Sequence, residues 1–520
     1  MRPSTSRTKQ KESITKKKTI KLVRKPSSWV HDENPPSNIG IFPEADYTSY
    51  RGKSPTELFD LFVGTDIIDF LVTETQRYAL FLNVQDPQIT AEEIKSFIGI
   101  LLLSGYNVVP SRRCYWENAL DTRNELVYNS MRRDRFEKIM RFIHCADNTN
   151  LDRQDKMCKL RPLINLMKER FMKNYIPEQC MNYDECMIPY FGRHPCKQFI
   201  RGKPIRFGFK AWCLNTSSGY LISFEIYQGN RVNANDEYES HYGKCAAPLV
   251  EMLYNLPHDT KSLPFCLYFD NLFTGFNLIN HLKQRGYDAT GTIRENRVPK
   301  DCGLTNSKTM KKMKRGYFEV LKSVEENISV IRWVDNSVVT VASSCHSVQP
   351  IGNVQRYSCT EKKKVAVPRP SVIGEYNRFM GGTDRMDESV SLYRIGIRGK
   401  KWWWSIFYWF LDTAVHNAWI IHRKSGGQMR LLAFRRSITQ TILIRQRNPP
   451  KGPGRTPSSA GSVTDSRVSD DLRYDGMNHL IIPYDERRRC AGCPSRIHTQ
   501  CVKCEVGLCV KCFAKFHVRS

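Results

Sequence analysis

The sequence predicts a multidomain α+β protein, and three observations lead to that prediction. The chain has 520 residues, which is more than one hydrophobic core can serve, so we expect three or four folding units. Apolar residues recur at helical spacing in the first third of the chain and follow strand-like patterns in the middle. Six of the 18 cysteines fall within the last 31 residues, which indicates a small metal-binding unit at that end.

The charge balance points to a polyanionic partner. Lys and Arg number 80 and Asp and Glu 52, which gives a net charge of +28. Such an excess repels itself in the free protein and favours binding to nucleic acid. A membrane surface is the alternative, but the longest apolar stretches, Phe97–Leu103 and Trp402–Leu411, are too short to span a bilayer. Twelve cysteines are scattered singly between Cys114 and Cys359, as expected in a reducing intracellular compartment.

The N-terminal part of the chain is expected to be a basic arm followed by helices. Residues 1–30 are polar and basic and predict a disordered arm, either a nuclear-localisation signal, a DNA-backbone contact or a solvated tail. Residues 31–180 carry a helical pattern, in which Thr90 is the expected N-cap of Ala91–Leu103. Arg135–His144 predicts another amphipathic helix crowded with basic residues, whose basic face is either solvated or contacts DNA.

The pattern changes in residues 181–297, which predict a mixed unit of strands and helices. Met181–Ile188 is typical of a strand, and Ile205–Ala211 and Tyr220–Ile226 are expected to form a β-hairpin. Pro264–Phe269 is a short continuous apolar run, as in a strand buried on both faces.

Residues 298–371 differ in composition and pattern from the segments on either side and predict an inserted basic β-rich module. A Lys-rich run precedes three short β-like segments, Tyr317–Leu321, Ile328–Val334 and Val338–Ala342. Helical character resumes in residues 372–392.

Two more helices, Trp402–Ile421 and Leu431–Ile444, are expected within residues 393–447. The tryptophans at 402–404 cannot all face one way on a helix, so we expect core packing for at least one of them rather than stacking on bases. Residues 448–486 begin with a Pro-, Gly-, Ser- and Thr-rich stretch and predict a flexible linker.

Three aspartates stand where predicted elements begin or end. Asp184 lies on the first strand of the mixed unit, Asp270 follows the apolar strand directly, and Asp384 lies at a helix start after two glycines. Asp387 shares a helix face with Asp384 because the two are three residues apart. Clustered carboxylates repel one another unless a divalent cation neutralises them, and hard oxygen ligands suit Mg²⁺ or Mn²⁺. The alternative is that these acids are ordinary turn or cap residues, Asp270 above all.

Four motifs that contain or flank these aspartates follow one another in order along the chain. They are Tyr183-Asp184-Glu185-Cys186-Met187, Gly202-Lys203-Pro204-Ile205-Arg206-Phe207-Gly208-Phe209-Lys210, Phe269-Asp270-Asn271-Leu272-Phe273-Thr274, and Tyr376-Asn377 with Gly381-Gly382-Thr383-Asp384-Arg385-Met386-Asp387. Together they resemble the motifs of the piggyBac transposase family, in particular of its transposable-element-derived members. The likeness covers about residues 50 to 440 and the cysteine-rich end.

The resemblance implies a specific domain arrangement. An RNase H-like catalytic core would take residues 181–297 and 372–392, interrupted by the β-rich insertion at 298–371. A helical DNA-binding and dimerisation domain would take residues 31–180 and 393–447. By motif, the family's three catalytic aspartates fall on Asp184, Asp270 and Asp384, and the nearby fourth acid falls on Asp387.

The resemblance also implies an activity, since family members move DNA elements flanked by TTAA through nicking, hairpin formation, hairpin opening and strand transfer. We therefore expect a nuclear transposase, a homodimer acting on double-stranded DNA, with Mg²⁺ or Mn²⁺ held by Asp184, Asp270 and Asp384. The alternative is a domesticated, catalytically inactive DNA-binding or chromatin-associated protein that keeps the fold.

Five basic residues border the inferred cleft and are expected to hold DNA phosphates. They are Lys203, Arg206, Lys210, Arg294 and Arg297. The alternative is that they balance the acids of the protein itself, because phosphate contacts and internal ion pairs use the same residue types.

The cysteine-rich end, residues 487–520, predicts a zinc-binding module. Three CxxC pairs and two histidines offer eight ligands, enough for two tetrahedral Zn²⁺ ions, which supply folding energy that so short a segment lacks. Interleaved pairing would place Cys490, Cys493, Cys509 and Cys512 on one ion, and Cys501, Cys504 and His517 on the other, with His498 as the candidate for its fourth ligand. The module resembles the family's cross-brace, which can bind element-end DNA, but also RING and PHD modules, so ubiquitin-ligase and chromatin-reader roles stay open.

Overall fold

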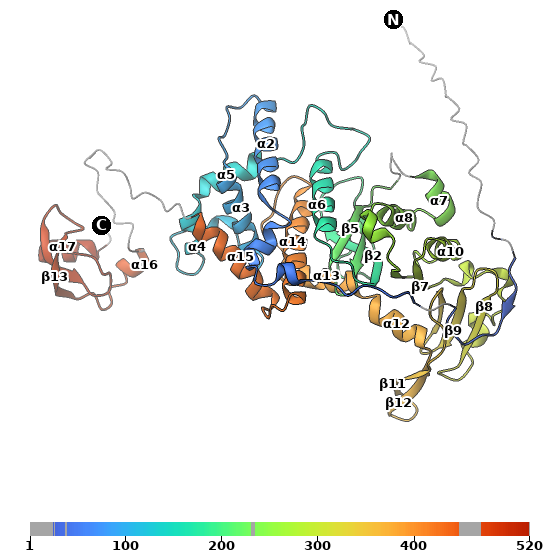
Figure 1. The fold of residues 1–520 in the computed structure, drawn as a ribbon. Coiled ribbons are helices and arrows are strands. Elements are labelled where there is room, and N and C mark those ends of the chain that lie inside the picture. The colour runs from blue at the N-terminus through green and yellow to red at the C-terminus, as the bar shows by residue number, and fades with distance from the viewer. Residues whose placement is uncertain are drawn as a thin grey trace, which may run out of the picture. The chain divides into compact units, whose positions relative to one another are not determined.

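The computed structural model describes residues 24, 26–36, 39–229, 235–446, 468 and 470–518. The chain divides into two compact units, Met1–Pro450 and Lys451–Ser520 (Figure 1). Each has a hydrophobic core of its own. Most of the expected basic arm, residues 1–23 and 25, lies outside the described residues, and so do residues 448–467 and 469 of the expected linker.

A ten-stranded mixed sheet forms the centre of the larger unit (Figure 1). Its strands are β1 (Trp29–Val30), β2 (Cys180–Pro189), β3 (Gln198–Phe199), β4 (Phe207–Thr216), β5 (Leu221–Ile226), β6 (Cys266–Phe269), β7 (Asp288–Thr292), β8 (Phe318–Ser323), β9 (Ser329–Val334) and β10 (Val338–Ser343). Their order is β1-β8-β9-β10-β7-β6-β2-β4-β3, with β5 paired to β4. The inner strands β7, β6 and β2 are parallel, and β10 and β4 pair with them in the antiparallel sense.

Helices cover both faces of the parallel strands. The side chains of neighbouring strand residues point to opposite faces. Tyr183 on β2 therefore points to one face, where its hydroxyl donates to the backbone oxygen of Cys245, just before α8 (Ala247–Tyr254). Asn182 points to the other face and donates to the Thr383 hydroxyl at the start of α13 (Gly382–Leu392). All four residues of β6 are buried, as its continuous apolar run predicts.

A helical layer surrounds one end of the sheet. It consists of α1 (Pro55–Asp60), α2 (Thr65–Phe81), α3 (Ala91–Leu103), α4 (Glu125–Ser130), α5 (Arg133–Phe142), α6 (Arg161–Lys173), α14 (Trp404–Lys424) and α15 (Leu431–Arg445). Thr90 caps α3 as expected, in a capping box with Glu93. The late helix α15 packs against α3, so helices from both ends of this unit share one core. In the described part of the chain, no helix is both long and apolar enough to cross a membrane.

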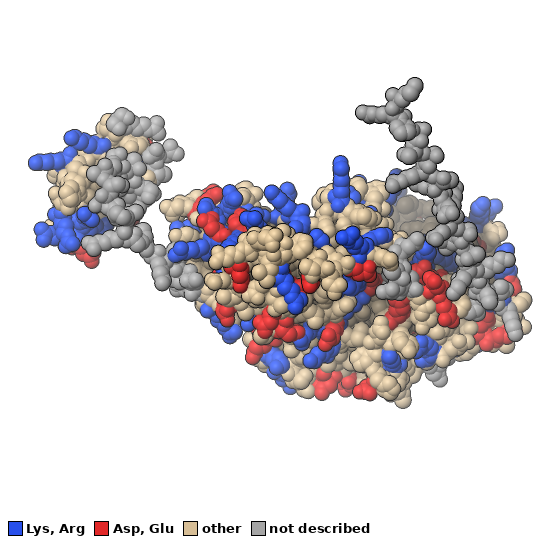
Figure 2. Space-filling view, turned by 90° about the horizontal axis from the view of Figure 1, so that it is seen from above, with Lys and Arg blue, Asp and Glu red and all other residues tan. Residues whose placement is uncertain are grey.

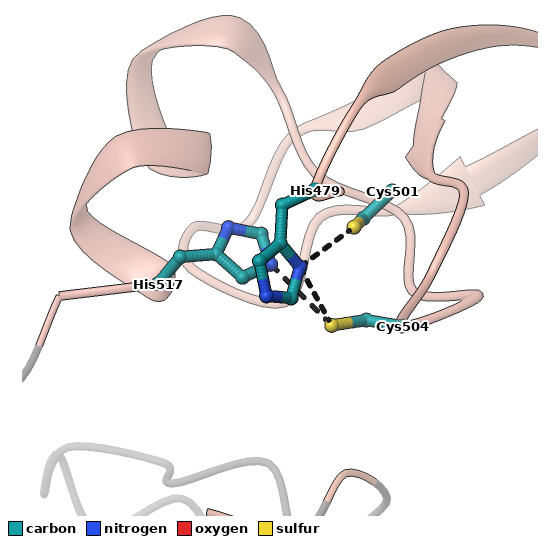
Figure 3. Close-up of side chains that lie close together, drawn as sticks. All are labelled: His479, Cys501, Cys504 and His517. Atoms are coloured by element: carbon teal, nitrogen blue, oxygen red, sulfur yellow. Dashed lines mark hydrogen bonds between the residues drawn. The ribbon is translucent and has the colours of Figure 1, made fainter. Parts of the chain in front are cut away.

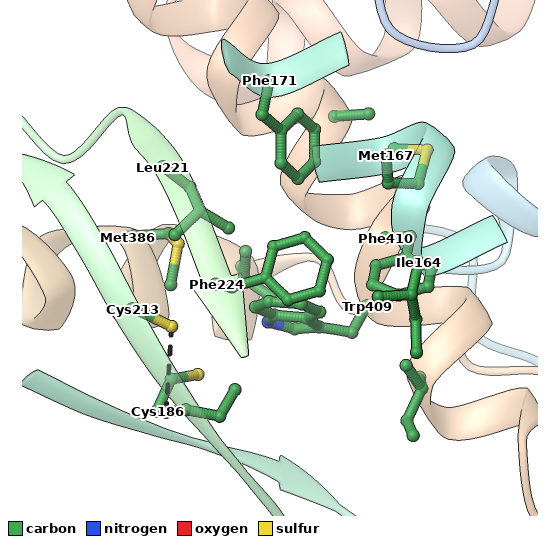
Figure 4. Packing of buried hydrophobic residues seen from close by; sticks show 14 of the residues in the cluster. Ile164, Met167, Phe171, Cys186, Cys213, Leu221, Phe224, Met386, Trp409 and Phe410 are labelled. Carbon is green, nitrogen blue, oxygen red and sulfur yellow. Dashed lines mark hydrogen bonds between the residues drawn. The ribbon is translucent and has the colours of Figure 1, made fainter. Parts of the chain in front are cut away.

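The contact between helices and sheet is aromatic (Figure 4). Phe224 of β5 lies between Phe171 of α6 and the pair Trp409 and Phe410 of α14, with ring centroids 6.1, 5.2 and 5.3 Å away. Trp403 and Trp404 are also buried, which confirms that the tryptophan run packs mainly into the core.

The segment expected to be a separate β-rich insertion continues the main sheet. Its three expected strands are present as β8, β9 and β10, and β10 pairs with β7. A further hairpin of β11 (Gly352–Ser358) and β12 (Lys363–Arg369) forms a sheet of its own and leads to α12 (Ser371–Phe379). The other short helices are η1 (Thr48–Tyr50), η2 (Arg112–Trp116), α7 (Asp236–Tyr242), α9 (His258–Lys261), α10 (Phe276–Gln284), η3 (Glu295–Arg297), η4 (Lys300–Cys302) and α11 (Ser307–Met310).

The end of the expected disordered arm is attached to this sheet, contrary to expectation. β1 pairs antiparallel with β8, and the Trp29 ring lies 5.8 Å from that of Phe276. Arg24 forms ion pairs with Asp301 at 2.9 Å and with Glu326 at 2.6 Å. A few aromatic and charged contacts with distant residues therefore order a segment that looks polar and featureless in the sequence.

The smaller unit begins earlier than residue 487, within the segment expected to be a linker. It contains α16 (Asp470–Arg473), the hairpin β13 (Ile481–Arg489) and β14 (Arg496–Cys501), and α17 (Val510–Phe516). Among its described residues, the buried core has seven members, three of them cysteines. So small a core needs additional cross-links, which is the usual reason for a structural metal.

Candidate functional site

Two of the predicted acids meet on neighbouring parallel strands. Tyr183 of β2 is in register with Phe269 of β6, so Asp184 and Asp270 follow at the same level of the sheet. Oxygen atoms of Asp184, Asp270 and Glu185 lie within 4.8 Å of one another. The Asp270 carboxylate accepts a 2.7 Å hydrogen bond from the Leu272 amide, which fixes it at the strand end. Glu185 was missed because an acid beside Asp184 gave no separate signal in the sequence.

Asp384 faces the same region from α13 but is not in this close group. Close backbone packing positions α13, since a Cβ on Gly382 would overlap the Asn182 side chain and the Thr216 carbonyl oxygen. The Thr383 hydroxyl accepts from Asn182 and donates to Asn215, at 3.0 Å each. Asp384 is exposed in the first turn of the helix.

Asp387 has a different environment from the other acids. Its Oδ1 atom accepts a 3.6 Å hydrogen bond from the Cys186 thiol of β2. Burial raises the pKa of its carboxyl above the ordinary range. These contacts hold α13 against the sheet.

The close acid group disfavours full ionisation. Burial, followed by repulsion from Glu185, raises the pKa of Asp184 to about 8. Burial also raises the pKa of Asp270. A divalent cation would relieve this repulsion, and a site that offers only carboxylate oxygens suits hard ions such as Mg²⁺ or Mn²⁺. The residues therefore fit such an ion.

Lys203 and Tyr376 link the three aspartates electrostatically. The Lys203 ammonium lies 3.5 Å from Glu185 Oε1. Burial disfavours its charge, but attraction to Glu185, Asp184 and Asp384 raises its pKa above the ordinary value. Burial, together with the negative charges of all three aspartates, raises the pKa of Tyr376 to about 12.

The other predicted basic residues are placed in different ways. The Lys210 ammonium lies 4.1 Å from the ring centroids of both Trp212 and Tyr227, and burial lowers its pKa. Arg206 is exposed.

Two arginines contact the loop that follows Asp270. Arg294 donates to Asn271 Oδ1 at 3.0 Å, and Arg297 donates to the backbone oxygens of Asn271, Leu272 and Thr274. Arg297 therefore supports the shape of the loop that presents Asp270.

In the smaller unit, the structure brings the cysteines together in the expected interleaved order. One group contains Cys490, Cys493, Cys509 and Cys512, whose ligand atoms lie within 4.8 Å of one another. The other group contains Cys501, Cys504, His517 and His479 (Figure 3). His479 Nδ1 lies 3.5 Å from each of the two sulfurs, and His517 Nε2 lies 3.4 Å from Cys504 Sγ. Both groups fit a tetrahedral zinc ion.

His479 takes the place that the sequence analysis gave to His498. His498 is exposed on β14, three residues before Cys501, and alternation along the strand turns the two side chains to opposite faces. His479 lies in the segment interpreted as a linker, before the first CxxC pair. Its distance from the CxxC pairs in the sequence therefore did not indicate a metal ligand. Its Nε2 atom lies 3.0 Å from Asp475 Oδ1, four residues earlier, and its other ring nitrogen faces the sulfurs of Cys501 and Cys504, as in histidines that bind metals.

The chain shows clear similarity to known proteins. A family model described as Transposase IS4 matches residues 54–419. Human PiggyBac transposable element-derived protein 3 is 40% identical over 518 residues, which cover 99% of this chain and 84% of that protein. Human PiggyBac transposable element-derived protein 2 is 38% identical over 468 residues, which cover 90% of this chain and 76% of that protein.

A solved structure has the same fold. It is a cryo-EM structure of a piggyBac transposase synaptic complex with hairpin DNA, which matches with a TM-score of 0.62 at 19% identity. The match covers 89% of this chain and 98% of that chain.

Proposed function

This chain belongs to the piggyBac transposase family, and from that premise we propose that it is a DNA transposase with a DDD active site. The proposed reaction is phosphoryl transfer: strand nicking, hairpin formation, hairpin opening and joining to a TTAA target. The observation that carries this proposal is the meeting of Asp184 and Asp270 on adjacent parallel strands, with carboxylate oxygens within 4.8 Å.

The sheet topology supports an RNase H-like catalytic core. The strands β5, β4 and β2 form an antiparallel meander, and β6 and β7 continue from β2 in parallel. The two metal-binding aspartates would then lie on the first and fourth strands of that core, which are neighbours in space. β8–β10 extend the core from β7 as the inserted segment.

In this proposal the aspartates divide the work of holding the ions. Asp184 and Asp270 provide the fixed ligands, and Asp384 completes the set from the exposed first turn of α13. Divalent ions of the Mg²⁺ class, when bound, supply activation of the attacking oxygen and stabilisation of the leaving oxygen. Lys203 balances the negative charge of the group, and Asp387 positions α13 through Cys186.

The proposed substrate is double-stranded DNA, bound in the nucleus by a homodimer. The net charge of +28 supports a polyanionic partner, and the matching solved structure is a synaptic complex with hairpin DNA. On the face shown in Figure 2, Lys and Arg are interspersed with Asp and Glu over the larger unit. We propose that Arg206 and Arg294 contact phosphates, and that the smaller unit carries two zinc ions and binds element-end DNA.

The test is an excision assay on a plasmid that carries candidate terminal repeats next to TTAA. The wild-type chain should restore a single TTAA, and Asp270→Ala should abolish excision. Asp259→Asn, an exposed acid in α9, is the matched control and should excise normally. A wild type that binds the repeats in a gel without excising them would contradict the proposal and favour a domesticated DNA-binding protein.

Ion binding can be tested separately by titration calorimetry with Mn²⁺. Asp270→Ala should lose binding, whereas the control variant should keep it. Equal Mn²⁺ binding by all three proteins would contradict the assignment of Asp270.

A further inference from the structure

A second cluster of metal-binding side chains lies on the face of the sheet that carries the acids, at the opposite end of the parallel strands. Residues two apart on a strand share a face. Cys180 and Asp184 therefore share a face on β2, and Cys266 on β6 shares it with Asp270. Cys180 is in register with Cys266, and Cys266 is in register with Asp288 of β7. One row across three strands thus places two thiols and a carboxylate side by side.

The antiparallel neighbour adds a third thiol to this row. Beyond the end of β10, the Ser344 amide donates to the Ala289 carbonyl at 3.0 Å, which continues the pairing with β7 and brings Cys345 level with Asp288. The two sulfurs of Cys266 and Cys345 and an oxygen of Asp288 lie within 4.8 Å of one another. The Cys266 thiol also contacts the thiol of Cys180, which lies beside this group of three and not within it.

The surroundings of this cluster are those of a built site. Cys266 and Cys345 are 2% and 3% exposed. The Ser344 hydroxyl donates to Asp288 Oδ1 at 2.9 Å, and Tyr268 Oη lies 3.0 Å from His346 Nε2. Polar partners thus surround the potential ligands and restrict their orientation, as around metal sites in general. All cysteines of the chain are free, so no disulfide accounts for the grouping.

We propose that Cys266, Cys345 and Asp288 form a third zinc site with Cys180 as the fourth ligand, distinct from the acid group and from the two zinc groups of the smaller unit. Three thiolates and one carboxylate are ligands that Zn²⁺ accepts in tetrahedral geometry, whereas Mg²⁺ does not favour sulfur. The inference does not depend on transposase activity, since it rests on the sheet register and the side-chain contacts alone.

Such a site would connect the sheet to α12, the helix that precedes α13 and its Asp384. Residues just after Cys345 bind the start of α12, because the Ser371 and Val372 amides donate to the carbonyl oxygens of Val348 and Ser347. The metal would fix this connection, and through α12 the position of α13.

The experiment measures zinc per chain by mass spectrometry of the purified full-length protein. The wild type should contain three zinc ions, one for each thiol-containing group. A variant that combines Cys490→Ser, Cys512→Ser, Cys501→Ser and Cys504→Ser should keep one ion, because its main sheet is unaltered. Wild type with two ions, together with a quadruple variant that contains none, would overturn the proposal.

A second set of variants tests the ligands directly. Cys266→Ser should lose one ion relative to wild type, and Cys302→Ser, a buried cysteine outside the groups, should lose none. After replacement of zinc by Co²⁺, the quadruple variant should show thiolate-to-cobalt absorption that Cys345→Ser removes. A metal-free quadruple variant would refute the metal site. If its mass is also two hydrogens below the reduced mass and Cys345→Ser removes that difference, the cluster forms a disulfide instead.

Discussion

The acid group makes the stability of the larger unit depend on pH in a way that Asp184→Asn should remove. The carboxyl of Asp184 has an ordinary pKa of 3.8 when the chain is unfolded and a pKa of about 8 in the folded protein. Below pH 4 the Asp184 carboxyl is protonated in both the folded and the unfolded protein. Between pH 4 and pH 8 it is protonated only in the folded protein. The free energy of unfolding therefore falls as the pH rises from about 4 to about 8.

The structure sets the size of this effect. Each unit of pKa shift corresponds to about 1.4 kcal/mol, so Asp184 alone contributes at most about 6 kcal/mol across the whole interval. Asn is nearly isosteric with the protonated acid and keeps the oxygen that accepts from the Glu185 amide at 2.7 Å. In magnesium-free buffer we expect Asp184→Asn to match the wild type near pH 4 and to exceed its stability by a few kcal/mol near pH 8.

Urea unfolding followed by tryptophan fluorescence measures this difference for the larger unit alone, because all nine tryptophans precede residue 450. Adding Mg²⁺ at pH 8 should stabilise the wild type more than Asp184→Asn, because the ion replaces the proton that the wild type releases. Asp259→Asn, an exposed acid, should follow the wild type at every pH. Parallel curves for wild type and Asp184→Asn from pH 4 to pH 8 would refute the reasoning.

Two further predictions concern the buried ion pair between α14 and α15 and the second zinc group. Arg435→Met should lower the free energy of unfolding by about 3–5 kcal/mol, because it leaves Asp412, 2.8 Å from Arg435 Nη1, charged and buried. Adding Asp412→Leu should restore most of that loss in the same fluorescence assay; an equal loss in single and double variants would contradict the pairing. His479→Ala should remove one zinc ion per chain whereas His498→Ala removes none, and the opposite pattern in metal analysis would contradict the ligand assignment.

Local sequence patterns predicted the features that depend on neighbouring residues. The apolar run before Asp270 indicated a buried strand, and β6 is buried throughout. The CxxC spacing indicated paired thiols, and the two interleaved groups contain all six cysteines. In both cases the functional residues lie within a few positions of the sequence pattern that predicted them.

Features that depend on pairing between distant strands could not be predicted in this way. Cys180, Cys266 and Cys345 are scattered through the sequence, and only the register of β2, β6, β7 and β10 brings them together. His479 was missed for the same reason, because the fold of the smaller unit returns it to Cys501 from 22 residues away. The positions of single cysteines and histidines in the sequence do not reveal which of them become neighbours until the order and pairing of the strands are known.

The two-residue strand β1 has a practical consequence for shortened versions of the chain. It is the outermost strand on its side of the sheet and covers part of β8. Deleting residues 1–30 would expose the backbone amide and carbonyl groups of β8 that now pair with β1. It would also remove the ion pairs of Arg24 with Asp301 and Glu326. An unpaired edge strand promotes edge-to-edge association between molecules. A shortened version of the chain should therefore begin before Arg24 and keep residues 24–30.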